Sequence, residues 1–107
     1  MSELILSTME TIPGRTIVSW KGLVQGNTVQ SKHVGRDIMA GLKNIVGGEL
    51  RGYTELLDDA RNKSVDRMVE QARSLGANAV VNIRFSTSSV TAGASELYAY
   101  GTAVVVD

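Results

Sequence analysis

One segment of the chain has apolar residues at spacings of three and four, which is the pattern of an amphipathic helix. Thr54 precedes this stripe as a candidate N-cap, and Gly76 follows it as the left-handed residue that often ends a helix. The pattern leaves the start of the helix open, either at Glu49 or after Gly52. The stripe consists of Leu57, Ala60, Ser64, Val65, Met68, Val69, Ala72 and Leu75.

Beyond Gly76 the polarity alternates with a period of two, which is typical of a half-buried strand. A second alternating segment runs from Thr16 to Val24, where Gly22 indicates a bulge or a close neighbour. Leu4 to Thr8 is predicted to form a short strand or an extended arm, and Gly26-Asn27 a turn. The strand after Gly76 has Ala79, Val81, Ile83 and Phe85 on one side and Val80, Asn82, Arg84 and Ser86 on the other.

The last predicted strand, Glu96 to Val106, is apolar on both faces and follows a predicted Ser- and Thr-rich loop, Ser86 to Ser95. One long helix covers only one face of a small sheet, so the second face needs another cover, and a second subunit is the simplest one. Gly101 and Ala103 are small enough to let a neighbouring chain approach closely. The two faces carry Tyr98, Tyr100, Val104 and Val106 on one side and Leu97, Ala99, Ala103 and Val105 on the other.

A first helix is predicted from Gly35 to Val46, and Gly47-Gly48 ends it. Together the elements predict a single α+β domain over residues 1–107, in the order β-β-α-α-β-β. We expect a two-layer subunit in which the long helix covers a mainly antiparallel sheet.

Composition limits the chemistry that this chain can perform. Its 107 residues include 11 basic and 11 acidic residues, one His and no Cys. A formal net charge of zero argues against nucleic-acid binding, and without Cys there is no disulfide, thiolate nucleophile or thiolate metal ligand. The single His33 is interpreted as a solvated loop residue. The N-terminus has an acid where a signal peptide has a base, and no apolar stretch is long enough to span a membrane, so we expect a cytoplasmic protein.

The most site-like cluster is Gly47-Gly48 with Glu49 and Tyr53. Glycines let a ligand approach the backbone, and exposed amides at a helix start attract anions. Glu49 and Tyr53 would orient a bound group. The simpler interpretation is that two helices turn a corner here, because corners use Gly. Arg36-Asp37 and Arg61 are expected to pair across the two helices, and structural ion pairs are favoured over a substrate clamp.

The chain resembles the YbjQ-like family of small bacterial proteins, which carries a heavy-metal-binding label. The resemblance implies an α+β subunit, comparable to that of the dodecins, which assembles into a ring with a pentamer as the expected size. It implies no established activity. The chain departs from the family pattern at Ser64, where Ala is expected, and at Asn82, where Gly is expected. The matching stretches are Gly35-Arg36-Asp37, Gly41 to Glu49, Tyr53 to Leu57, Ala60-Arg61, Gly76 to Val80, Arg84-Phe85 and Tyr100 to Val104.

Two functions follow as hypotheses. The first is a non-enzymatic homo-oligomer that binds a small ligand or a divalent metal ion at clefts between subunits. The alternative is a metal-assisted hydrolase that uses carboxylates such as Glu49. The missing Cys and second His, and the lack of a recognisable nucleophile and base, favour the first hypothesis. The expected partner is a second copy of the chain, with neither nucleic acid nor membrane.

Overall fold

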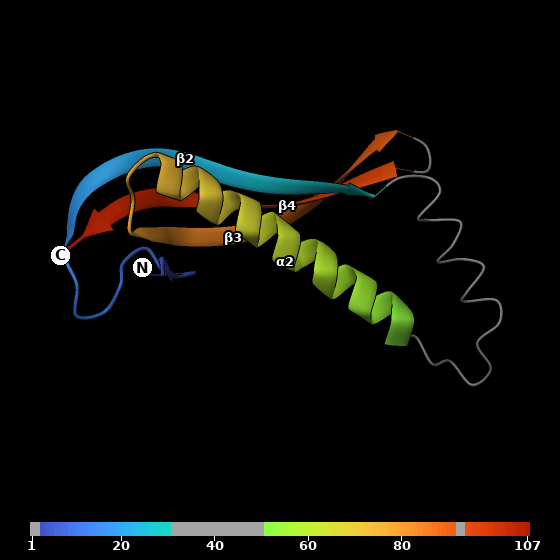
Figure 1. The fold of residues 1–107 in the computed structure, drawn as a ribbon, viewed down its shortest axis with the longest axis horizontal. Coiled ribbons are helices and arrows are strands. Elements are labelled where there is room, and N and C mark those ends of the chain that lie inside the picture. The colour runs from blue at the N-terminus through green and yellow to red at the C-terminus, as the bar shows by residue number, and fades with distance from the viewer. Residues whose placement is uncertain (1–2, 31–50, 92–93) are drawn as a thin grey trace.

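The computed structural model describes residues 3–30, 51–91 and 94–107, and these form one helix and a mixed sheet (Figure 1). The sheet order is β1-β3-β4-β2, with β1 parallel to β3 and the other pairs antiparallel. The predicted α+β class is confirmed, and the order is β-β-α-β-β, while the predicted helix Gly35–Val46 lies outside the described residues. The elements are β1 (Ile5–Leu6), β2 (Ile17–Gln30), α2 (Arg51–Ser74), β3 (Ala79–Thr91) and β4 (Ala94–Val106).

The β3–β4 hairpin is longer than the sequence predicted, because the expected loop Ser86–Ser95 lies largely within the two strands. Ser86 pairs with Tyr98, and the antiparallel ladder continues to Ser89 and Ser95. A Ser- and Thr-rich segment lacks apolar periodicity, yet Thr is favoured in strands and cross-strand hydrogen bonds satisfy its backbone. The lack of apolar periodicity in this segment therefore did not indicate a loop.

Gly76 ends α2, as predicted. Its φ of 82° is left-handed, and its N–H donates to the carbonyl of Arg73 while the N–H of Ala77 donates to that of Ala72. This pair of bonds is a Schellman motif, and the apolar residues that accompany it are Ala72 and Ala77, both buried in the same core. The predicted N-cap at Thr54 is wrong, because the helix already runs at Arg51 and its first turn contains no acidic residue.

Close contact between α2 and β2 fixes how the helix lies on the sheet. Gly26, predicted to be in a turn, lies inside β2 beneath the helix backbone at Ser64 and Met68. A Cβ at Gly26 would also meet the Cβ of Arg67 at 2.7 Å. The Ser64 side chain is fully buried, and its hydroxyl donates back along the helix to the carbonyl of Ala60 at 3.0 Å. Small residues at this crossing therefore let the helix and strand backbones touch.

A bulge in β3 rearranges the faces predicted for that strand. Asn82 has a φ of 56°, and the register with β4 shifts between Val81 and Arg84. As a result Ile83 packs with Val80 in the core beneath α2, whereas Val81 packs on the opposite face. Phe85 shares its face with its partner Ala99, but it is 48 % exposed because α2 lies mainly over β2 and β4. The prediction that Ala79, Val81, Ile83 and Phe85 share one face was therefore wrong, because the bulge interrupts the two-residue period.

The sheet has a core on each face. The core beneath α2 includes Met68 and Ala72 of the helix with Val24, Val80 and Ala99 of the strands. On the other face, Ile12 covers Ala79, Val81, Val104 and Val106, with Ile5 and Ile17 packed beside them. At this end of the sheet the second cover is thus the chain's own N-terminal segment, which lies beside β3 in Figure 1.

The residues expected to admit a neighbouring chain are instead used inside the subunit. Ala103 is fully buried in the core beneath α2. A Cβ at Gly101 would meet Val80 Cγ1 at 2.8 Å and the Val81 carbonyl at 2.9 Å. The prediction that Gly101 and Ala103 face another subunit was therefore wrong, because the sequence pattern could not tell which face the helix occupies. Gly22 does mark a bulge, as predicted, at the register shift after Trp20.

We expect Gly26→Ala to destabilise the protein by roughly 1–3 kcal/mol or more, because the added methyl group has no space against the helix backbone. Urea unfolding followed by circular dichroism measures the change. Gln25→Ala is the matched control, since Gln25 is exposed on the neighbouring position of the same strand. Equal stability of Gly26→Ala and the control would show that the close crossing is not a constraint.

We expect Asn82→Ala to lower the free energy of unfolding by about 1 kcal/mol, because Ala tolerates the left-handed conformation less well than Asn. Asn82→Gly keeps that conformation accessible, so its urea unfolding midpoint should be at least as high as that of Asn82→Ala. A stability ranking with Ala above Gly would contradict the assigned bulge.

Candidate functional site

Most of the sequence-predicted site lies outside the described residues. This applies to Arg36, Asp37, Gly47, Gly48 and Glu49. Tyr53 belongs to α2, and only its place in that helix is described.

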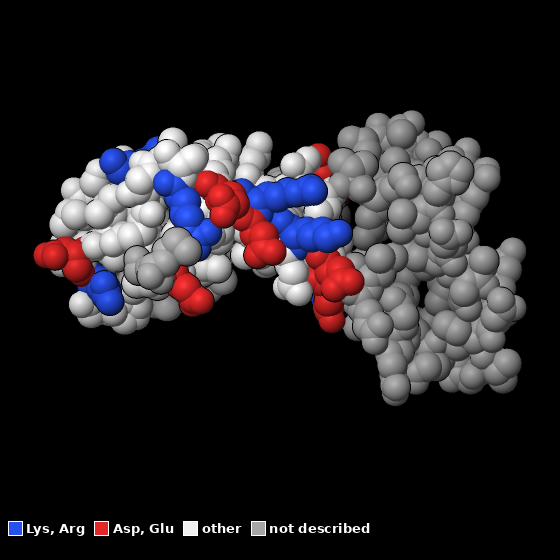
Figure 2. Space-filling model, viewed as in Figure 1, with Lys and Arg blue, Asp and Glu red and all other residues white. Residues whose placement is uncertain are grey.

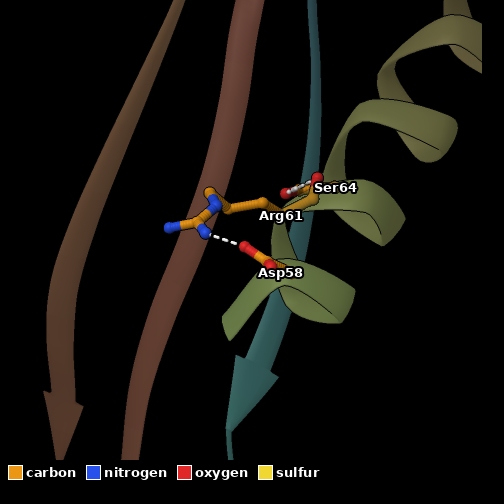
Figure 3. Close-up of polar contacts among 3 residues, drawn as sticks. All are labelled: Asp58, Arg61 and Ser64. Atoms are coloured by element: carbon orange, nitrogen blue, oxygen red, sulfur yellow. Dashed lines mark hydrogen bonds and ion pairs between the residues drawn. The ribbon is translucent and has the colours of Figure 1, made fainter. Parts of the chain in front are cut away.

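Arg61 lies on the exposed surface of α2. Its guanidinium pairs with the carboxylate of Asp58, one turn earlier on the same helix, while the Ser64 hydroxyl donates to the backbone carbonyl of Arg61 (Figure 3). The side chains of the pair are 46 % and 54 % exposed, so solvent screens the interaction and its net stabilisation is at most a few tenths of a kcal/mol. Within the described residues, the ion pair of Arg61 is local to one helix, and the predicted pairing with Arg36-Asp37 lies outside those residues.

A polar depression of about 290 Å³ lies on the sheet face away from α2. Gln25 and Asn27 of β2 and Glu96 and Tyr98 of β4 line it. Asn27 is directly opposite Tyr98 across the two strands, and its amide Nδ2 donates to Glu96 Oε2 at 3.0 Å. The register thus brings together two carboxamides, a carboxylate and a phenol from positions about 70 residues apart in the chain.

The helix supports this depression from the outer edge of β2. The backbone N–H of Gln25 donates to Gln71 Oε1 at 2.7 Å, and Arg67 donates to the carbonyl of Asn27. Both helix side chains hydrogen-bond backbone groups that an edge strand leaves unpaired. The strand positions that carry Gln25 and Asn27 are therefore held in place by α2, although their side chains lie on the other face of the sheet.

An aromatic and apolar surface continues from the depression along the same face. Tyr98 and Tyr100 are neighbours on β4, with ring centroids 5.7 Å apart and planes inclined at 36°. Further along β2, Leu23 pairs with Thr102 and Trp20 pairs with Val104. Leu23 is 71 % and Trp20 69 % exposed, so this face presents two large apolar side chains to solvent.

The sequence reasoning missed the depression because it placed Gly26-Asn27 in a turn. The available signal was the i, i+2 spacing of Gln25 with Asn27 and of Glu96 with Tyr98, which puts each pair on one face of its strand. Only the register between β2 and β4 brings the two pairs together.

Charged side chains of both signs share the described surface, and metal ligands are not clustered on it. Figure 2 shows basic and acidic side chains interleaved over the face that carries α2, as expected for a neutral chain. Among residues 3–30, 51–91 and 94–107, no group of three or more His, Cys, Asp or Glu side chains is placed to bind a metal ion. Within the same ranges, no helix is long and apolar enough to cross a membrane.

The fold resembles a crystal structure of a Pediococcus pentosaceus protein of unknown function from the DUF74 family, with a TM-score of 0.63 and 15 % identity. That match covers 97 % of this chain and 98 % of the other, and it supports the fold alone.

Sequence relatives are much closer. A UPF0145 protein of Hahella chejuensis is 67 % identical over 97 % of this chain and 100 % of its own length. A UPF0145 protein of Archaeoglobus fulgidus is 60 % identical over 95 % and 94 %, respectively. The family model described as "Putative heavy-metal-binding" matches residues 4–107. The chain therefore belongs to the YbjQ family of UPF0145 proteins, whose function is unknown.

Proposed function

We propose that this chain is a non-enzymatic subunit of a homo-oligomer, and that clefts between its subunits bind a small ligand or a metal ion. The observation that carries the proposal is the exposure of Trp20 and Leu23 on the sheet face that α2 does not cover. Aromatic residues such as Trp are enriched at the centres of protein interfaces, where their burial contributes much of the binding energy. A second subunit seated here would remove both side chains from water.

The position of this surface favours a cleft rather than a flat contact. The N-terminal segment covers one end of the same face through Ile12, and the polar depression begins at Gln25, two residues beyond Leu23. A subunit that buries Leu23 would therefore border the depression and turn it into an intersubunit cleft. Contacts between two different patches close into rings when the rotation allows it, which is consistent with the pentamer implied by the family resemblance.

Such clefts could bind either a metal ion or a small polar molecule. The family description favours a metal ion. Heavy metals prefer thiolate and imidazole ligands, and the sequence contains no Cys and one His, so a protein-bound metal would rely on oxygen ligands contributed by more than one chain. The depression, in contrast, already groups four polar side chains within one chain.

The alternative function is a metal-assisted hydrolase that uses Glu49. Its supporting observation is the adjacent Gly-Gly sequence, which would allow a substrate to approach the backbone. With no Cys and a single His, the general base and the metal ligands would both have to come mainly from carboxylates, so the enzyme ranks second.

We expect the wild-type chain to have a mass several times its 11.4 kDa subunit when measured by light scattering at micromolar concentration. Leu23→Glu places a charge in the proposed contact and should shift the particle towards the monomer, with the circular dichroism of a folded subunit. Leu75→Glu, at a 42 % exposed position beyond the end of α2, is the matched control and should leave the mass unchanged. A stable, well-folded wild-type monomer would contradict the proposed assembly.

We expect one member of a panel of divalent metals, nucleotides and metabolites to raise the melting temperature of the oligomer, because a ligand that binds only the folded state stabilises it. The hydrolase alternative instead requires metal-dependent turnover that Glu49→Ala abolishes while the fold survives. A screen in which nothing raises the melting temperature, at concentrations far above a plausible dissociation constant, would count against ligand binding.

A further inference from the structure

We propose that the depression lined by Gln25, Asn27, Glu96 and Tyr98 binds a neutral, hydroxyl-rich molecule of monosaccharide size. This inference rests on the proposed ligand-binding function and assigns it a site and a ligand class. The volume of about 290 Å³ lies just below the range of small-molecule sites, which begins at roughly 300 Å³, so it suits a ligand of small size.

The hydrogen-bonding groups in the depression match hydroxyl groups. The bond from Asn27 Nδ2 to Glu96 Oε2 fixes which end of the carboxamide donates, and it leaves Asn27 Oδ1 and Glu96 Oε1 as acceptors. Gln25 and Tyr98 each add a donor and an acceptor. A hydroxyl group donates and accepts at the same oxygen, so a polyol can engage such a mixed set, whereas a ligand with acceptors alone cannot.

The charges around the depression select against anions. Glu96 contributes a carboxylate, and one arginine of α2 and one of β3 are bound to backbone carbonyls. Arg67 donates to Asn27 at the outer edge of β2, and Arg84 donates to Thr8 at 2.8 Å, towards the N-terminal segment. Phosphate recognition in proteins relies on directed cations or backbone N–H groups, and the described lining of this depression contains no cationic side chain.

The aromatic neighbours suit the apolar part of a sugar ring. Tyr98 lines the depression, and its ring lies 5.7 Å from that of Tyr100, which extends the aromatic surface towards Leu23. A ligand that combines hydroxyl groups with a C–H face can contact the polar set and this surface together. A neighbouring subunit on Leu23 would enclose the exposed side of such a ligand.

The test titrates the oligomer with D-glucose, D-ribose and myo-inositol, and in separate arms with glucose 6-phosphate and with calcium chloride, while backbone amide chemical shifts are recorded. At least one neutral polyol should give saturable shifts at Asn27 and Tyr98, and glucose 6-phosphate should bind at least tenfold more weakly than glucose. Glu96→Ala and Asn27→Ala should each weaken polyol binding at least tenfold. Glu96→Gln should reduce the difference in affinity between glucose and glucose 6-phosphate, because it removes the negative charge and keeps the shape of the side chain.

Glu70→Ala is the matched control, since Glu70 is an exposed carboxylate on α2 that pairs with Arg73 and lies away from the depression. It should leave polyol affinity unchanged. Polyol binding that is insensitive to both depression variants, equal affinity for glucose and its phosphate, or no saturable polyol binding would overturn the inference. Calcium or another ligand bound in the depression without any polyol would overturn this ligand class alone and leave the proposed function standing. A monomer that binds none of the probes would overturn both.

Discussion

The close crossing of α2 and β2 at Gly26 is the contact on which the rest of the structure depends. Because Gly26 has no side chain and Ser64 is small, the helix backbone lies directly on the strand, and Met68 and Ala72 then fill the core beyond it. The same crossing brings Gln71 and Arg67 to the outer edge of β2, where they hydrogen-bond its backbone. The two small residues thus set the distance between the helix and the sheet and the position of α2 over β2 and β4. They also place the helix side chains that hydrogen-bond the edge strand.

Once α2 occupies one face, the other face becomes available for function. Its apolar end is closed by Ile12 and its neighbours, whereas Trp20, Leu23 and the polar depression remain beyond that cover. The division also explains why β4 is apolar on both sides without requiring a partner along its whole length. Ala99 and Ala103 pack beneath the helix, Val104 and Val106 pack with the N-terminal segment, and the stretch around Tyr98 and Tyr100 is half-buried.

The sequence predicted the features that depend on neighbours in the chain. The apolar stripe of α2 and its stop at Gly76 follow from local periodicity and from one left-handed residue, and both are confirmed. Asn82 shows where such reasoning ends, because a single left-handed residue reverses the faces of every residue after it. The departure from the family's expected Gly at this position was visible in the sequence, but its meaning depends on the φ of 56°. The depression was beyond prediction for a related reason, since the register of β2 on β4 determines which polar pairs meet.

The chemistry of the depression follows from its location on two neighbouring strands. A site built from alternate strand residues presents its side chains in a regular array, with Asn27 facing Tyr98 and Gln25 facing Tyr100. Such an array is held by the backbone ladder and needs no flexible loop to place its groups, so its donors and acceptors are positioned before any ligand arrives. The hydrogen bond between Asn27 and Glu96 adds to this order by linking the two strands through their side chains. Preorganisation of this kind reduces the entropy lost on binding, so that even a small, open site can contribute affinity. A neighbouring subunit would then increase that affinity by excluding water from the site.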